Sequence, residues 1–218
     1  PDSGQEVMMN DVKFLRAPTI FKSFQEINKK IGIITAKDKL RALLGAGLTI
    51  NGLNTKCFSS EKANSATLET NGIGNVERWL NMSIPDVYSS ELSEFVFASG
   101  LKLLEEWFPD VMYLSTTDYI QHKYAPEDKE AIKFLTMIDN YLSEISKFDV
   151  TMVITADHGM SAKHNKNGDP QIVFIQDFLD EEFGINSTNV ILPITDPYVV
   201  HHGALGLSLI HISEPTRP

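Results

Sequence analysis

The sequence predicts an α/β fold, a sandwich of helices around a mostly parallel central sheet. Two observations carry this prediction. Segments with apolar residues at helical spacing alternate along the chain with short apolar runs rich in β-branched residues. The runs are typical of buried strands that helices cover, as in parallel sheets. In such sheets ligands bind beyond the carboxyl ends of the strands, so polar residues at those ends are the candidates for a site.

The first predicted elements are a helix and a strand. Pro18 suits a first helical turn, and apolar residues recur at helical spacing from Ile20 to Ile27. Ile31–Thr35 is predicted to be a short buried strand. From about residue 45 to 90, glycine, asparagine and serine are frequent and no period holds. We predict an irregular region there, or part of a cap inserted over the core.

Two longer helices and further strands are predicted next. Ser90 with Glu94 favours a helix start, and Pro109 ends that helix. A strand is expected at 111–116. An amphipathic helix follows, with one apolar side made of Ile132, Leu135, Ile138, Leu142 and Ile145. Residues 150–155 form the next expected strand, and 171–176 are a further candidate.

Composition excludes several classes of protein. The net charge of −10 argues against a nucleic-acid partner, whose phosphates need a basic surface. No apolar run approaches the ~20 residues of a membrane span, and the N-terminus lacks the pattern of a signal peptide. The single cysteine, Cys57, fits a reducing compartment and is expected to be a buried small hydrophobe. We therefore expect a cytoplasmic protein with neither nucleic acid nor membrane as partner.

The two ends of the chain are unusual. The first residue is not Met, which suggests a fragment or a processed form. Residues 207–217, LSLIHISEPTR, correspond to the translation of a string that resembles a transposase end joined to a sequencing adapter. We predict that 207–218 is a non-native tail outside the fold, which excludes His211 as a ligand. A native terminal strand followed by a coil is the alternative.

Acids and imidazoles recur at or near three predicted strand ends. The three groups are Asp118 with His122, Asp157 with His158, and His201 with His202. Taken singly, each group also has a plainer interpretation: a helix cap and a surface histidine, a turn, or a histidine pair without a role. Their occurrence together, in order after apolar strands, favours a metal site, because histidine and carboxylate suit zinc and other divalent transition metals.

The order of these motifs resembles the alkaline phosphatase superfamily, in particular its nucleotide pyrophosphatase/phosphodiesterase-like branch. Within it, the chain is similar to the phosphonoacetate hydrolase family over nearly all of residues 6–206. The segments that carry the similarity are VMMND, FLRAPTI, TAKDKLR, YSSELSEFVFASG, MYLSTTDYIQHKYAP, TADHGMSAKH and DPYVVHHGALG. The resemblance implies an alkaline-phosphatase-like α/β/α sandwich with an inserted cap, truncated here at both ends, with 1–206 as a partial hydrolase domain.

The resemblance also implies two divalent metal ions, usually zinc, in one cleft. The implied ligands are Asp118, His122 and His202 for one ion, and Asp157 and His158 for part of the second. His202 is preferred to His201 because the superfamily ligand directly precedes a glycine, here Gly203.

Lys37 and Lys39, in TAKDKLR, would bind the anionic substrate, a small-molecule phosphonate. The family's nucleophilic threonine and one metal-binding aspartate would lie upstream of this chain, so no catalytic nucleophile is assigned within it. The resemblance implies hydrolysis of phosphonoacetate to acetate and phosphate by the full-length parent, with this fragment itself inactive. A phosphodiesterase or pyrophosphatase of the same superfamily, or a catalytically dead metal-binding protein, are the alternatives. The number of subunits is left open, with a homodimer as one option.

Overall fold

The computed structural model describes residues 11–162, 164–171, 173–191 and 209–212 of the 218-residue chain. The chain divides into two compact units, residues 1–120 with 132–156, and residues 121–131 with 157–218. Each unit is described by itself.

The first unit is built on a parallel sheet of three strands in the order β2-β1-β3. The strands are β1 (Ile31–Thr35), β2 (Thr55–Ser59) and β3 (Val111–Ser115). Ile33 in the middle of β1 lies opposite Cys57 on one side and Tyr113 on the other. All of β1 is buried, as a central strand covered on both faces must be. The predicted strands at 31–35 and 111–116, and the parallel α/β fold, are confirmed.

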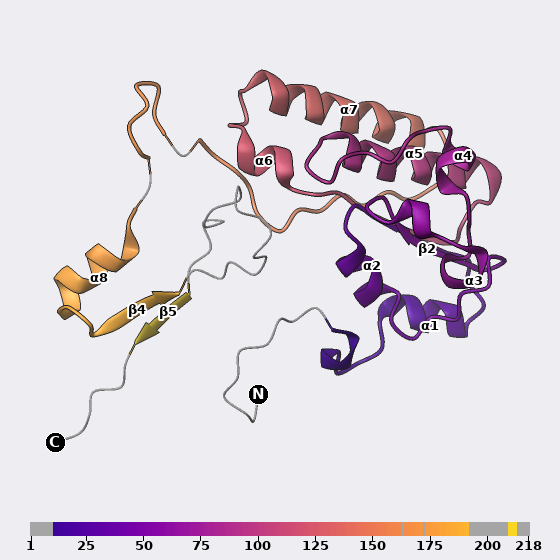
Figure 1. The fold of residues 1–218 in the computed structure, drawn as a ribbon, viewed down its shortest axis with the longest axis horizontal. Helices are drawn as coiled ribbons and strands as arrows, with labels where there is room; N and C mark the ends of the chain where they lie inside the picture. Colours follow the sequence, from indigo (N-terminus) through magenta and orange to yellow (C-terminus); the bar gives the residue numbers. More distant parts are fainter. Residues whose placement is uncertain (1–10, 163, 172, 192–208, 213–218) are drawn as a thin grey trace. The chain divides into compact units, whose positions relative to one another are not determined.

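Helices cover both faces of this sheet (Figure 1). The elements of the first unit, apart from the strands, are η1 (Val12–Phe14), α1 (Ile20–Glu26), α2 (Asp38–Leu44), η2 (Ala63–Ser65), α3 (Leu68–Asn71), α4 (Val76–Leu80), α5 (Glu91–Glu106) and most of α7 (Lys129–Ile145). Side chains of β1 alternate between the two faces. Ile34 packs in a cluster with α5, whereas Ile31 and Ile33 pack in another with Phe21 of α1.

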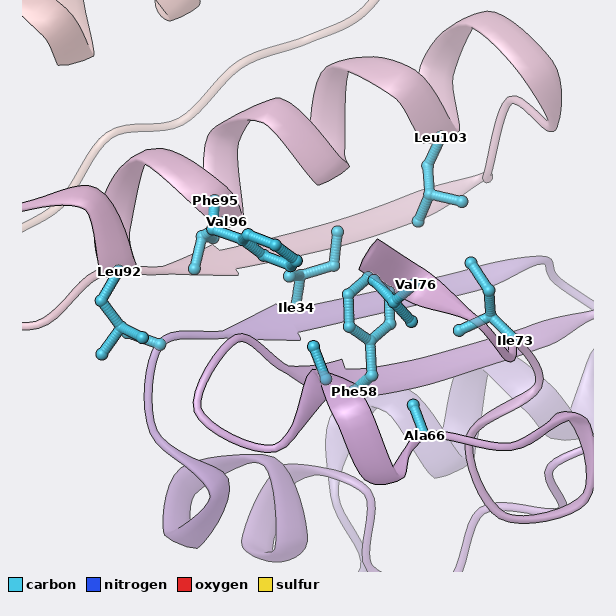
Figure 2. Packing of buried hydrophobic residues seen from close by; sticks show 11 residues of the cluster. Ile34, Phe58, Ala66, Ile73, Val76, Leu92, Phe95, Val96 and Leu103 are labelled. Carbon is cyan, nitrogen blue, oxygen red and sulfur yellow. The ribbon is translucent and has the colours of Figure 1, made fainter. Parts of the chain in front are cut away.

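The larger cluster lies between α5 and the sheet (Figure 2). Phe58, Phe95 and Val96 are completely buried in it. Complete burial of such a side chain contributes about 1.5–3 kcal/mol to folding. This cluster therefore fixes α5 over the strands whose ends carry the candidate site.

The helix α7 packs on α5 through Ile138, Leu142 and Ile145, which lie with Phe97 and Leu104 in a third cluster. The expected apolar side of this helix is correct only in part. Ile132 and Leu135 are each 52% exposed, and Phe134 is 2% exposed in their place. The buried stripe of α7 is thus rotated toward Phe134 over its first turns.

The interpretation of residues 45–90 as an irregular region or cap is wrong for its central part, because β2 belongs to the sheet. The strand was missed because its sequence, TKCFS, does not look apolar. Thr55 and Ser59 are nonetheless 0% and 1% exposed. Ala66, Ile73 and Val76, from the same range, complete the larger cluster (Figure 2).

The strand predicted at 150–155 is not formed. Residues 151–156 have no regular structure, and Val153 is 84% exposed. A strand needs a neighbour to satisfy its backbone groups, and no described strand pairs with this segment.

The candidate strand at 171–176 is also wrong, because Ile175 begins the helix α8 (Ile175–Phe183). Ile175 and Leu179 lie at helical spacing, and Leu179 is the buried residue of that helix.

The second unit contains α8 and an antiparallel pair, β4 (Thr188–Ile191) and β5 (Leu209–Ile212). The short helix α6 (Tyr119–Lys123) begins in the first unit and ends in the second. Gln176 of α8 accepts a hydrogen bond from the backbone N–H of Val190, which ties α8 to β4. Leu209–Ile212, within the predicted tail, pair with β4. The non-native origin of residues 207–218 stays a prediction. The exposed edge of β4 is a template for such a β-rich segment.

Candidate metal and substrate site

The carboxyl ends of the three parallel strands meet at one edge of the sheet in the first unit. Backbone hydrogen bonds continue past the strands, from Ala36 N–H to Ser115 O and from Ser60 N–H to Thr35 O, each at 2.8 Å. The segments that follow β1, β2 and β3 therefore leave the sheet side by side. Lys37 follows β1 and Asp118 follows β3, so these two candidate residues lie at the same edge.

Lys37 occupies the position before the first residue of α2. Its carbonyl oxygen accepts a hydrogen bond from the Thr35 hydroxyl at 2.7 Å, which fixes the backbone. Its side chain is half-buried, with the ammonium nitrogen 5.4 Å from the centre of the Tyr88 ring. The attraction between a cation and an aromatic face can hold the ammonium group in place without an ion pair. Lys39, two residues further along in the first turn of α2, is exposed.

Tyr88 also approaches the segment that carries Asp118. The rings of Tyr88 and Tyr119 have centroids 6.1 Å apart, and Tyr119 directly follows Asp118. The side chain of Asp118 is exposed, whereas the preceding Thr117 is buried and donates its backbone N–H to the Ser93 hydroxyl at 3.2 Å. Ser93 of α5 thus anchors the backbone before Asp118, and Tyr88 contacts both predicted substrate and metal segments.

Three of the predicted metal ligands lie together in the second unit. The rings of His122 and His158 have centroids 6.0 Å apart at an interplanar angle of 69°. The Asp157 carboxylate accepts the backbone N–H of His158 at 3.0 Å, and its other oxygen lies 3.7 Å from His158 Nε2. His158 Nδ1 lies 3.0 Å from the Gly159 carbonyl oxygen. A ring nitrogen bonded to a carbonyl leaves the other nitrogen oriented as a ligand.

The donor chemistry of these side chains fits a divalent transition metal, because imidazole nitrogen and carboxylate oxygen are its preferred ligands. The full predicted set is not assembled. No group of three or more His, Cys, Asp or Glu side chains is arranged to hold a metal ion among the described residues. Asp118 belongs to the first unit and is not placed relative to the histidines. His201 and His202 lie outside the described residues.

Two minor expectations can be compared with the structure. Cys57 is 1% exposed, and burial raises the pKa of its thiol to about 11, as expected for a small buried side chain without reactivity. His164, for which exposure was favoured over a place beside the metal, is exposed.

Sequence reasoning missed Tyr88, Ser93 and Glu61. Tyr88 and Ser93 lie within a segment that carried the family resemblance, but nothing in their spacing marks a role. Glu61 follows β2, a strand that the sequence did not reveal, so its place at the carboxyl edge could not be inferred.

The chain belongs to the type I phosphodiesterase / nucleotide pyrophosphatase family, whose model matches residues 19–206. Membership implies dependence on divalent metal ions. Among solved structures, the chain is similar to phosphonoacetate hydrolase from Sinorhizobium meliloti 1021, in complexes with phosphonoformate and with phosphonoacetate. In each case the identity is 56% and the TM-score 0.80, over 94% of this chain and 49% of the other. The chain thus spans about half the length of these relatives. No described helix is long and apolar enough to cross a membrane.

Proposed function

We propose that the protein of which this chain is a part hydrolyses the carbon–phosphorus bond of phosphonoacetate, giving acetate and phosphate. The observation that carries this proposal is the 56% identity, over 94% of the chain, to a phosphonoacetate hydrolase whose structure holds phosphonoacetate. Lysines at the carboxyl edge of the sheet support it, because a phosphonate with a carboxylate needs cationic partners.

The residues proposed to hold two zinc ions are Asp118, His122 and His202 for one, and Asp157 and His158 for part of the other. The contact between the His122 and His158 rings supports this grouping. Bound divalent ions would polarise the phosphoryl oxygens and offset the negative charge that develops in the reaction.

Lys37 and Lys39 are proposed to bind the anionic substrate. Lys37 has two contacts that would orient it: its carbonyl oxygen accepts from the Thr35 hydroxyl, and its ammonium group lies over the Tyr88 ring. Carbon is a poor leaving group, so a cation near the acetate portion would lower the energy of the negative charge left there when the bond breaks.

The runner-up function is hydrolysis of a phosphodiester or pyrophosphate, which the family's description favours. Both functions need the metal ligands, but only the first needs a site for a small dianionic substrate. The test compares kcat/KM for phosphonoacetate and for a nitrophenyl nucleotide ester, using protein from the complete reading frame that contains this chain. We expect the larger value for phosphonoacetate. Cleavage of the ester alone would overturn the proposal and leave the metal site in place.

We also propose a cytoplasmic protein whose partner is a small-molecule phosphonate rather than nucleic acid or a membrane. The net charge of −10 supports the exclusion of nucleic acid. A homodimer is one assembly open to it, and its mass in solution measures this directly.

A further inference from the structure

The start of α2 is capped by a residue from the segment that follows β2. Lys37 precedes this helix and makes no side-chain hydrogen bond to its free N–H groups. A lysine cannot do so, because its ammonium group has no acceptor. The first helical N–H, that of Asp38, instead donates to Glu61 Oε2 at 2.9 Å. Glu61 follows β2, so the group that caps α2 comes from the segment after the neighbouring strand.

Asp38 makes a second contact between the first turn of α2 and β2. Its Oδ1 accepts hydrogen bonds from the Ser59 hydroxyl at 2.8 Å and from Arg41 Nε at 2.6 Å. Partial burial acts to raise the pKa of Asp38, but the hydrogen bonds from Arg41 and Ser59 outweigh it, and the pKa lies below its ordinary value. Asp38 is therefore held as a carboxylate at neutral pH.

The position of Glu61 is itself set by the sheet. Its backbone N–H donates to Ala36 O at 3.1 Å, directly after the bond from Ser60 N–H to Thr35 O. The register of β1 and β2 thus carries the Glu61 carboxylate to the level of the first turn of α2.

We infer that Glu61 and Asp38 are positioning residues for substrate binding, because they hold the turn from which Lys37 and Lys39 project. Neither needs to touch the substrate. The inference rests on the proposed function, in which these lysines bind phosphonoacetate. It goes beyond the proposed function by assigning the orientation of the lysines to a carboxylate in the segment that follows β2.

The test replaces Glu61 in protein from the complete reading frame and measures kcat and KM for phosphonoacetate. Glu61→Ala removes the acceptor, and we expect KM to rise about tenfold, with kcat within about twofold of the wild type. Glu61→Gln keeps an oxygen that can accept the same N–H, so its KM should stay within about twofold. Glu69→Ala is the matched control, since Glu69 is exposed and has no described hydrogen bond or ion pair.

A merely structural role predicts a different pattern. Loss of folded protein lowers the apparent kcat and leaves KM unchanged, and a shift in Tm would reveal it. An unchanged KM in Glu61→Ala, with an active wild type, overturns this inference alone. A wild-type protein that does not hydrolyse phosphonoacetate overturns the proposed function and the inference with it.

Discussion

At the scale of single residues, Lys37, which we propose binds substrate, has contacts that would orient it beforehand. Thr35 fixes its carbonyl group, Glu61 caps the turn that it opens, and the Tyr88 ring lies beneath its ammonium group. A flexible lysine loses much rotamer freedom when it binds an anion. Contacts that order the side chain beforehand reduce that loss, so binding is expected to be tighter.

The charge of Asp38 makes the stability of the protein depend on pH. Because the pKa of Asp38 in the folded state lies below its ordinary value of 3.8, the unfolded chain binds its proton more readily. The stabilisation is therefore present above the ordinary value and is lost as the pH falls through the folded pKa. Between about pH 5 and about pH 3, the free energy of unfolding should fall more steeply for the wild type than for Asp38→Asn.

The control is Asp139→Asn, whose carboxylate has no hydrogen bond or ion pair in the described part of the chain. Its unfolding free energy, from urea titrations at each pH, should run parallel to that of the wild type. Parallel curves for Asp38→Asn as well would show that the Arg41 and Ser59 contacts do not favour the carboxylate.

Two buried serines on α5 offer a direct comparison. Ser93 accepts the backbone N–H of Thr117, just before Asp118, whereas the Ser99 hydroxyl has no described hydrogen-bond partner. Both side chains are fully buried. Ser93→Ala should lower the free energy of unfolding by about 1–3 kcal/mol, because a buried N–H loses its acceptor. Ser99→Ala should be neutral or stabilising, and equal losses in the two variants would contradict the assignment.

At the scale of elements, the packing of the turn after α3 against β2 depends on one glycine. Gly72 has a φ of +72°, and a Cβ atom there would lie 2.1 Å from the carbonyl oxygen of Thr55. Thr55 is the first residue of β2, so a side chain at Gly72 would push against the sheet itself.

The matched variant is Gly47→Ala, because Gly47 has a φ of +75° with no atom nearer than 3.9 Å to the added Cβ. We expect Gly47→Ala to cost roughly 1–2 kcal/mol for the left-handed backbone alone. Gly72→Ala should cost clearly more, since the clash is added to the same strain. Thermal unfolding of the two variants measures the difference, and equal shifts in Tm would remove the steric argument.

The elements also show where sequence reasoning succeeds. The strand β1 was predictable because its apolar side chains bury both faces. The strand β2 was not, because Thr55 and Ser59 are polar residues whose burial follows from their neighbours rather than from their own character. Residues 150–155 look like a strand, yet pairing depends on a partner elsewhere in the chain, which local pattern does not reveal.

At the scale of the whole molecule, the candidate site is distributed over distant parts of the sequence. Asp118, His122, Asp157 and His158 were chosen from their order after apolar runs. The ring centroids of His122 and His158 lie 6.0 Å apart, and the role of these residues as metal ligands stays a prediction. Glu61 and Ser93 could not be predicted from the sequence, because their hydrogen bonds are made to residues that are distant in the chain. The residue types that can bind a metal are visible in the sequence, whereas hydrogen bonds between distant segments depend on how the elements are arranged in the fold.

A single assay that follows both products of phosphonoacetate hydrolysis decides whether the complete protein is a carbon–phosphorus hydrolase. Protein from the complete reading frame is assayed for phosphate and for acetate, before and after treatment with a chelator. We expect equal molar release of the two products, loss of release with the chelator, and recovery when zinc is added back. Absence of release, or release that the chelator leaves unchanged, would contradict a metal-dependent carbon–phosphorus hydrolase.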